Sequence, residues 1–515
     1  MKKLLFFTLL VSVIFYCCDP VMKENGYVIL SRPVLYDFDI GSEYELKNLK
    51  EAMASIKDLN IPTDKIVIFR LAGEIFISDS EDVLNHPDGD RIRITGQDLT
   101  PAIAITAVSI DGNNARITLK NSPPQDIKPG YVVRIRDVSG NDSINGAYEI
   151  SQVTGNDVYV KSLCKFLQVD TGESGSVQFF RTILKYVGCN GIVVNAANKL
   201  NVLDNVAIVG NGFNGGIVIS DNSSLNVSNN TYNIAVIDFD IGVNVINKSM
   251  IAINGACSNN NNSNGIQSTT DSTIYGKDIN ASNNGGSGIV GEFASFCIIS
   301  GGCANNNSVN GILTTEASTI HADYFTTNYN GENGIRANTG STISAPYSKA
   351  NNNIKYGICS YSGSTIRADN STANNNESGI VSYAGSEIWA INSTASHNIK
   401  DGFCAWENSE LCVSNSTAEY NGYCGFNSIS GSSIFAYGMD NNSSVETFSR
   451  YNTLGFRAIT NSTITGNFNT KARGNSSFDM YANNLSTIIC NMDSSYYFPE
   501  SNGELEGGGS YILPY

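Results

Sequence analysis

The stretch GILTTEASTIHADYFTTNYNGEN, residues 311–333, is followed by GIRANTGSTISAPYSKANNNIKY, residues 334–356, which has the same length and plan. Each begins with Gly-Ile, carries a second Ile eight positions after the first, and contains turns rich in Asn. Repeats of this length predict a stacked, one-dimensional architecture. The Gly-apolar anchor recurs, mostly every 23 residues, at Gly191, Gly216, Gly242, Gly265, Gly288, Gly311, Gly334, Gly357, Gly379, Gly402, Gly425 and Gly455.

Within each unit, apolar or small residues alternate with polar ones. In the unit that starts at Gly357, Ile358 and Ser360 are followed by Ile366 and Ala368. A period of two indicates strands, and the Gly and Asn residues between them suit turns with positive φ. Such strands can bury their inward residues only against the coils above and below. The sequence therefore predicts an all-β protein, a right-handed parallel β-helix of about twelve coils.

The N-terminal part departs from the repeat. Ser42 and Glu45 have the spacing of a capping box, and Leu46, Leu49 and Met53 begin one apolar helical face. We expect this helix to cover the open end of the first coil, within a unit of residues 19–97. Residues 98–180 lack the repeat and predict a small inserted antiparallel β domain. The β-helix is then expected over residues 181–475, with a C-terminal cap at 476–515.

Residues 1–18 predict a signal peptide, because Lys2 and Lys3 precede a short apolar run. Cys17 and Cys18 close that run and are candidates for lipidation, which would anchor an exported protein to a membrane without spanning it. We expect a secreted protein, or a lipoprotein of the cell surface or outer membrane.

Composition excludes several partners. The net charge is −16, and no Lys or Arg cluster suited to nucleic acid is present. Ten cysteines follow the predicted signal peptide, without the spacing of a zinc site. We predict no metal and no cofactor. Cys359 and Cys404 fall in an outward register, which would expose reactive thiols in an exported protein.

Three stretches together resemble the β-helical tail-fibre and tailspike-like proteins of bacteriophages, within the pectate-lyase-like superfamily. They are the cap helix leading to NHPDGDRIRI at 85–94, the β domain around 132–160, and the repeats with their Ser-Thr-Ile and Asn-rich turns. The resemblance implies a homotrimeric, glycan-facing adhesin and, in some members, a polysaccharide depolymerase. The signal peptide departs from the family, since phage fibres are assembled in the cytoplasm. A bacterial surface lipoprotein is therefore an alternative to a place in the phage virion tail.

Residues at equivalent positions of successive repeats form one candidate site. Glu387 and Glu410 fall at the same position of successive coils, so we expect their backbones at roughly one strand spacing, close to the ~5 Å between the carboxyl groups of retaining glycosidases. The same coils carry both tryptophans and other aromatic or acidic residues that suit a carbohydrate. The predicted ligand-binding residues are Tyr361, Tyr383, Trp389, Trp406 and Glu407.

These outward-facing residues have alternative interpretations. The outward apolar stripe would equally suit a homotrimer interface, or a surface covered by the C-terminal segment. Asp238 and Asp240 alternate on another expected strand, but no Asp-Asp or Gly-His-Gly motif of the hydrolases is present. Because no third group completes an active site, a glycan-binding adhesin is favoured over a polysaccharide hydrolase or lyase. A structural spacer is the third alternative.

Overall fold

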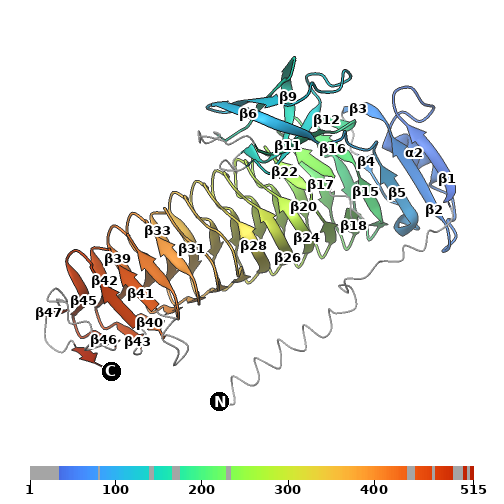
Figure 1. Cartoon of the computed structure of the whole chain (residues 1–515). Coiled ribbons are helices and arrows are strands. Elements are labelled where there is room, and N and C mark those ends of the chain that lie inside the picture. Colours follow the sequence, from blue (N-terminus) through green and yellow to red (C-terminus); the bar gives the residue numbers. More distant parts are fainter. Residues whose placement is uncertain are drawn as a thin grey trace.

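The computed structural model describes residues 34–78, 82–138, 144–164, 174–227, 233–437, 447–466, 470–490, 503–506 and 511–514. The predicted signal peptide and Cys17 and Cys18 lie outside the described residues. The chain forms a long rod of stacked coils, a parallel β-helix, with a small barrel on one side near the N-terminal end (Figure 1). In the described residues, no helix is long and apolar enough to cross a membrane.

Two long sheets form two sides of the rod in the described part of the chain. Sheet 1, with 15 strands, contains β4 (Asp82–Val83), β13 (Ile192–Val194), β17 (Gly215–Ile219), β20 (Ile241–Val245), β23 (Ile266–Ser268), β25 (Ile289–Gly291), β27 (Ile312–Thr314), β29 (Ile335–Ala337), β31 (Tyr356–Tyr361), β33 (Ser378–Tyr383), β36 (Phe403–Trp406), β39 (Cys424–Ile429), β42 (Leu454–Ile459), β45 (Phe478–Asn483) and β47 (Gly503–Glu506). Sheet 2, with 19 strands, contains β3 (Gly73–Ser78), β12 (Thr182–Val187), β14 (Lys199–Leu200), β16 (Val206–Val209), β18 (Ser224–Val227), β19 (Ile234–Ile237), β21 (Met250–Ile253), β22 (Cys257–Asn259), β24 (Thr273–Asn280), β26 (Phe296–Cys303), β28 (Thr319–Thr326), β30 (Thr342–Ser344), β32 (Thr365–Arg367), β34 (Glu387–Trp389), β37 (Glu410–Cys412), β40 (Ser433–Ala436), β43 (Thr463–Gly466), β46 (Thr487–Cys490) and β48 (Tyr511–Pro514).

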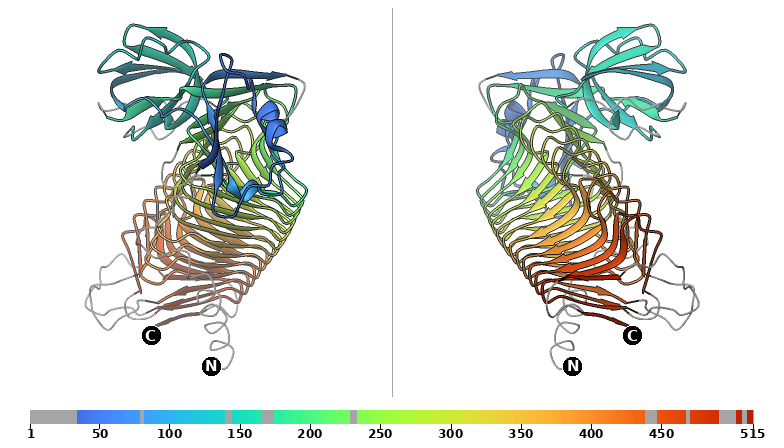
Figure 2. Two further views of the ribbon diagram at one scale, coloured as in Figure 1. Left: turned by 90° about the vertical axis from the view of Figure 1, so that its right-hand side faces the viewer. Right: turned by 90° about the vertical axis from the view of Figure 1, so that its left-hand side faces the viewer.

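A third side is completed by a short sheet and by isolated bridges. Sheet 3 contains β35 (Thr394–Ser396), β38 (Thr417–Glu419), β41 (Thr447–Arg450) and β44 (Thr470–Arg473). Corners with positive φ separate the sides. In one coil they fall at Ser362 and Gly363, at Asn370 and at Asn375. These left-handed corners explain the Asn and Gly between the strands, because those residues adopt this conformation at little cost. Figure 2, which looks toward the two ends of the rod, shows the coils stacked behind one another.

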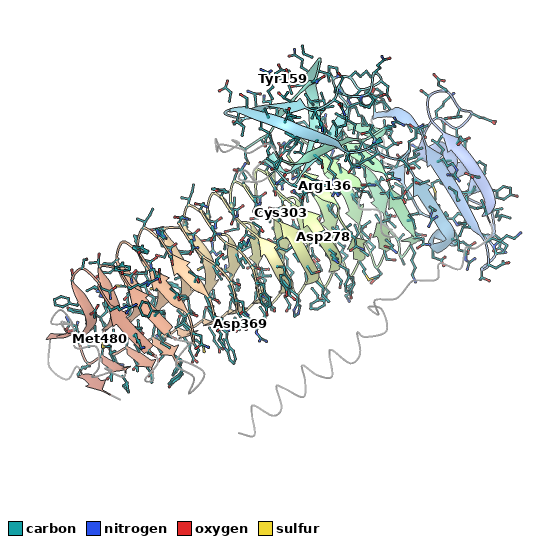
Figure 3. The ribbon with its side chains drawn as sticks, viewed as in Figure 1. Arg136, Tyr159, Asp278, Cys303, Asp369 and Met480 are labelled. Carbon is teal, nitrogen blue, oxygen red and sulfur yellow. The ribbon has the colours of Figure 1, made fainter. Side chains whose placement is uncertain are left out.

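The predicted fold class is confirmed, but the predicted number of coils is wrong. The rod has about 17 turns rather than about twelve, and its described part includes 15 strands in sheet 1. The extra strands of sheet 1, β4, β45 and β47, lack the Gly-Ile anchor on which the count rested. Met480 occupies the position of the anchor's apolar residue, opposite Phe456, and Asp479 precedes it. Figure 3 marks Met480 in these terminal turns.

The residues that point into the core alternate along each strand with the predicted period of two. Ile358, Ile366, Ala368 and Ala373 are all buried in one continuous core. The anchor Gly is needed because the coils approach closely there. At Gly334 an added Cβ would lie 2.7 Å from the carbonyl oxygen of Gly357 and 2.8 Å from Cβ of Ala350. No side chain larger than hydrogen fits that position without displacing the next coil.

A buried ladder of asparagines links the coils. The backbone N and Nδ2 of Asn330 both donate to Oδ1 of Asn353, at 2.9 and 3.0 Å. Each amide thus satisfies polar groups of the neighbouring coil, which would otherwise be buried without partners. The Asn clusters of the sequence therefore have a structural role. The ladder contains Asn261, Asn284, Asn307, Asn330, Asn353, Asn376, Asn398, Asn421, Asn452 and Asn475.

The N-terminal end of the rod is covered by helix α2 (Leu49–Ile56). Its N-cap is Asn48, whose side chain accepts from the backbone N of Glu51, so the capping box predicted at Ser42 and Glu45 is wrong. The predicted apolar face is otherwise present, since Leu49, Met53 and Ile56 are buried with the core. A four-stranded sheet of β1 (Val34–Ile40), β2 (Ile66–Leu71), β5 (Ile92–Thr95) and β15 (Val202–Asp204) lies beside it.

The NHPDGDRIRI stretch ties this helix to the first coils. The buried side chain of His86 contacts the carbonyl oxygen of Ile56 through Nε2 at 3.0 Å, and Asp88 accepts from the backbone N of Ile61 at 2.9 Å. Arg91, the last residue of the 3-10 helix η1 (Gly89–Arg91), pairs with its N-cap residue Asp88 at 2.9 Å. These contacts give the stretch a structural role in the cap.

The side domain is a closed antiparallel barrel of β6 (Ile103–Asp111), β7 (Asn114–Leu119), β8 (Val132–Arg136), β9 (Gly146–Thr154), β10 (Asp157–Lys161) and β11 (Ser176–Phe179). It is inserted between consecutive coils, because β3 before it and β12 after it pair in parallel from Gly73 opposite Thr182. Buried contacts fix it to the rod. Arg134 donates to the carbonyl oxygen of Gly255 at 2.6 Å, and the hydroxyl of Tyr148 accepts from Nδ2 of Asn283 at 2.8 Å.

The segment 476–515, expected as a C-terminal cap, contains β45, β46, β47 and β48, which extend sheets 1 and 2. The rod therefore continues into this segment. The aromatic run Tyr496–Pro499 within this segment lies outside the described residues.

Candidate functional site

An aromatic stripe, defined as Tyr361, Tyr383 and Trp406, lies on the outer face of sheet 1. The three residues occupy the same position of β31, β33 and β36 and are paired in register, as the sequence predicts. The rings of Tyr361 and Tyr383 are 4.7 Å apart and nearly parallel, at 8°. The ring of Trp406 lies 5.2 Å from that of Tyr383 at 87°. The stripe therefore contains two different ring orientations.

The orientation decides which ring can stack on a ligand. Because the two tyrosines stack at about the strand spacing, each covers a face of the other and turns its edge outward. The indole of Trp406 is perpendicular to them and its side chain is 40% exposed. Trp406 is thus the stripe's best platform for the apolar face of a ligand, while the tyrosines contribute hydroxyl groups at their edges. The hydroxyl of Tyr383 donates to Oε1 of Glu407 at 2.8 Å, which raises the pKa of Tyr383 to about 12.

Beside the stripe, at the neighbouring outward position of the same strands, lies an apolar column formed by Cys359, Val381 and Cys404. These residues point outward from sheet 1, yet Cys359 is only 3% and Cys404 only 5% exposed, because Tyr356 and Ile429 pack against the column. The expectation of exposed thiols is therefore wrong. Burial raises the pKa of Cys359 to about 12 and raises that of Cys404 as well. Both thiols stay protonated at neutral pH and are poor nucleophiles.

A polar relay that the sequence analysis missed continues this column toward the C-terminus. Asp401 is 8% exposed and accepts from the backbone N of Cys424 and from Nδ2 of Asn427, both at 3.1 Å. Asn427 in turn accepts from a terminal nitrogen of Arg457 at 3.3 Å. Burial raises the pKa of Asp401. Only the tertiary register joins the three, since they come from successive coils with no local motif.

The other basic side chains around the stripe are paired. Glu332 contacts Lys355 at 2.6 Å and Arg336 at 3.8 Å, and Lys400 contacts Glu377 at 2.5 Å. Arg336 also lies over the ring of Tyr361, at 5.7 Å from its centroid. The face thus carries charges of both signs around an apolar centre.

The predicted pair of glutamates lies on sheet 2, around a corner from the stripe. Glu387 and Glu410 are direct partners of β34 and β37, as the sequence predicts. Burial, and then the charge of Glu387, raise the pKa of Glu410. Trp389, 43% exposed, donates from its indole nitrogen to Glu387. These are features of a carboxylate pair with unequal environments.

The predicted single site is therefore divided between two sides of the rod. The left-handed residues Glu407 and Asn408 form the corner that separates Trp406 on sheet 1 from Glu410 on sheet 2. Among the predicted residues, Tyr361, Tyr383, Trp406 and Glu407 are brought together, and Glu387, Trp389 and Glu410 form a second group. The two groups belong to the same coils, and repeat spacing assigns residues to coils without showing which side of the rod each one faces.

The weaker acidic candidate is not on a strand. Asp238 has a positive φ of 62° and lies with Asp240 in the turn between β19 and β20, so the predicted alternation on one strand face is wrong. Burial raises the pKa of Asp238 to about 7. In the described part of the chain, no group of three or more His, Cys, Asp or Glu side chains is arranged to hold a metal ion.

Comparison with known proteins finds no matching family model and no matching curated protein. Among solved structures, the A-module of the mannuronan C-5 epimerase AlgE4 of Azotobacter vinelandii is 11% identical, with 91% of this chain and 92% of that chain covered and a TM-score of 0.34. The Gp54 tailspike of Acinetobacter baumannii bacteriophage AP22, solved with a capsular saccharide, is 10% identical, with 89% and 76% covered and a TM-score of 0.24. The tailspike gp49 of Pseudomonas phage LKA1 is 12% identical, with 90% and 76% covered and a TM-score of 0.25.

These likenesses are too distant to carry an argument about function. The fold is established by the strand pairings of this chain, which define a parallel β-helix. What the outer face can bind has to follow from the side chains described above.

Proposed function

We propose that this protein is an exported or virion-associated β-helical rod that binds a surface glycan on the outer face of sheet 1. Tyr361, Tyr383, Trp406 and Glu407 are its contact residues. The observation that carries this proposal is the orientation of Trp406, an exposed indole turned perpendicular to the tyrosine stack beside it. The core of the rod does not need a large aromatic ring at this outward position.

The chemistry around Trp406 suits a carbohydrate. The apolar face of a sugar ring packs on an indole, while its hydroxyl groups need donors and acceptors at the rim. Glu407 supplies a carboxylate beside the indole, and Tyr383 holds that carboxylate through its hydroxyl group. The paired Lys and Glu side chains around the stripe offer further polar partners.

Binding to an array of bacterial surface polysaccharides tests the proposal. We expect Trp406→Ala to weaken binding at least about tenfold, or about 1.4 kcal/mol. Tyr324→Ala is a matched control, because Tyr324 is an exposed, stacked aromatic residue far along the chain from the stripe. If Trp406→Ala leaves binding unchanged while the thermal unfolding temperature is retained, the stripe is not the site.

The stripe has a competing use as an interface between copies of the chain. A homotrimer that buries Trp406 would dissociate when this residue is changed to Ala. Light scattering of the same variants separates the two uses, since loss of glycan binding without a change in mass supports a ligand site. A change in mass supports the interface.

A second candidate function is polysaccharide hydrolysis or cleavage by a lyase on sheet 2. It is favoured by the direct pairing of Glu387 with Glu410 and by the raised pKa of Glu410, because a carboxyl group that serves as a general acid has to retain its proton. The test is release of reducing ends from capsular polysaccharide. Activity that persists in the Glu387→Gln, Glu410→Gln double variant would exclude this pair.

Export and anchoring belong to the same proposal. The N-terminal sequence supports a cleaved signal peptide with Cys17 or Cys18 as the lipidated residue. Mass spectrometry of the mature N-terminus distinguishes a surface lipoprotein from a virion component. An acylated cysteine on cell envelopes supports the first, and an unprocessed chain in phage particles supports the second.

A further inference from the structure

Two arginines lie in one outward column of sheet 1, on either side of its apolar centre. The column runs from Arg336 through Cys359, Val381, Cys404 and Asn427 to Arg457, each residue being the register partner of the next. The aromatic stripe follows the neighbouring outward position of the same strands. The two arginines therefore lie beyond either end of the same apolar centre.

The charged and aromatic neighbours of Arg336 differ from those of Arg457. The guanidinium of Arg336 lies 3.8 Å from the carboxylate of Glu332, which also pairs with Lys355. Arg457 forms no ion pair within the part of the chain that the structure describes. It donates to Asn427 and lies over the ring of Tyr423, 5.2 Å from the ring centroid. Arg336 contacts a carboxylate directly, whereas Arg457 has no carboxylate in direct contact and is linked to the buried Asp401 through Asn427.

The buried side chains of Asn427 and Asp401 fix the position of Arg457. The side chain of Asn427, 1% exposed, presents its oxygen to Arg457 because its amide group donates to the buried Asp401. One terminal nitrogen of the guanidinium is thereby engaged by a buried polar side chain. The remaining N–H groups retain the planar fork that pairs with carboxylate, phosphate or sulfate oxygens.

We propose that Arg457, held by Asn427 and Tyr423, is an anion subsite that makes the rod select glycans bearing a negatively charged group. This inference rests on the proposed glycan-binding function and adds the charge class of the ligand. Arg457 lies two coils beyond Cys404, the neighbour of Trp406, which corresponds to roughly 10 Å along the rod. One acidic oligosaccharide can therefore contact the indole and the guanidinium together.

The net charge of −16 is compatible with an anion subsite, because the contact between Arg457 and an anion is direct. Charges more than about 8 Å away are largely screened at physiological ionic strength, whereas a direct guanidinium–anion contact is screened much less. The subsite should therefore act as a selector for charge at one position of the glycan. Its contribution is expected to fall as salt is raised.

The test uses the full mature chain and a panel of purified acidic capsular polysaccharides, each beside its carboxyl-reduced form, with neutral dextran as a blank. We expect the native acidic form to bind at least about tenfold more tightly than the reduced form, as for a lost charged hydrogen bond. Arg457→Gln should abolish that preference and Arg457→Lys should keep part of it. Arg336→Gln is the matched control in the same column and should leave the preference unchanged.

The outcomes separate this inference from the proposed function. Equal binding of acidic and reduced forms, or a preference that survives Arg457→Gln, overturns the anion subsite while leaving glycan binding at Trp406 in place. Absence of binding to every polysaccharide overturns both. Thermal unfolding monitors the fold, and Gln at this position retains a donor for Asn427, so a change in selectivity is not a consequence of unfolding.

Discussion

The buried carboxylate of Asp401 accepts a hydrogen bond of 3.1 Å from the side chain of Asn427, which belongs to the next coil of the rod. Burial raises the pKa of Asp401, and its other oxygen accepts from the backbone N of Cys424. Both of these hydrogen bonds come from the neighbouring coil. Relations of this kind, between equivalent positions of successive coils, hold the rod together and also shape its outer face.

Asn427→Ala should destabilise the protein by about 1–3 kcal/mol, because it removes one donor from a buried carboxylate. Adding Asp401→Asn should recover part of that loss, since a neutral side chain tolerates burial better than an unpaired charge. Urea unfolding of the two single variants and the double variant measures the coupling. Strictly additive losses would contradict a direct role for this hydrogen bond.

The asparagine ladder should be sensitive to a single gap. Asn353→Ala removes the oxygen that accepts from both the backbone and the side chain of Asn330, so we expect a loss of about 1–3 kcal/mol in the free energy of unfolding. Thr342→Ala, at an exposed strand position of the same coil as Asn353, should change the free energy of unfolding by less than about 0.5 kcal/mol. Similar effects of the two substitutions would show that the ladder is dispensable.

Asp82 should make stability depend on pH at the capped end of the rod. It is 1% exposed, burial raises its pKa to about 6, and its side chain accepts from the hydroxyl of Tyr186 at 2.7 Å. Because the folded pKa lies above the unfolded value, the unfolded chain ionises first as pH rises. Stability should therefore fall between about pH 4 and pH 6, by up to about 3 kcal/mol, and then level off with respect to this group.

Asp82→Asn should flatten this dependence of stability on pH. Compared with the unchanged protein, the variant should gain more in unfolding temperature at pH 7 than at pH 4. Asp58→Asn is a suitable control, because the side chain of Asp58 is 91% exposed. An unfolding profile with the same slope between pH 4 and pH 6 in the Asp82 variant would exclude Asp82 as its source.

The thiols of Cys359 and Cys404 should be protected in the folded protein. Their burial beneath Tyr356 and Ile429, together with raised pKa values, predicts reaction with a thiol reagent at neutral pH only after unfolding. Peptide mapping after brief alkylation, with and without urea, measures this for each residue. Fast modification of Cys404 in native protein would mean that Tyr356 and Ile429 do not cover it.

Much of the fold could be predicted from local pattern. The spacing of Ile312, Ile320 and Ile335 predicts strands that stack at a fixed repeat, and the register of Glu387 with Glu410 follows from counting residues. The helix start was placed wrongly at Ser42, because several polar residues near Asn48 can cap a helix and packing decides among them. The terminal turns were missed because β4, β45 and β47 lack the anchor residues.

The candidate site was only partly predictable. Tyr361, Tyr383 and Trp406 were placed in one column by their spacing, but spacing does not give ring orientation, which distinguishes Trp406 from the stacked tyrosines. Arg457 and Asp401 were not found at all. Their relay through Asn427 crosses coils of unequal length, including a longer gap before Gly455, where a fixed count of 23 loses the register.

The sequence by itself determined the parallel β-helix, because a period of two within a repeat of 23 residues leaves each coil unable to bury its apolar residues except against its neighbours. The tertiary structure decided which outward columns share a side of the rod. The left-handed corner at Glu407 and Asn408 turns the chain between Trp406 and Glu410, so residues four apart in sequence face different directions. The direction of a corner depends on backbone dihedral angles, which spacing alone does not specify.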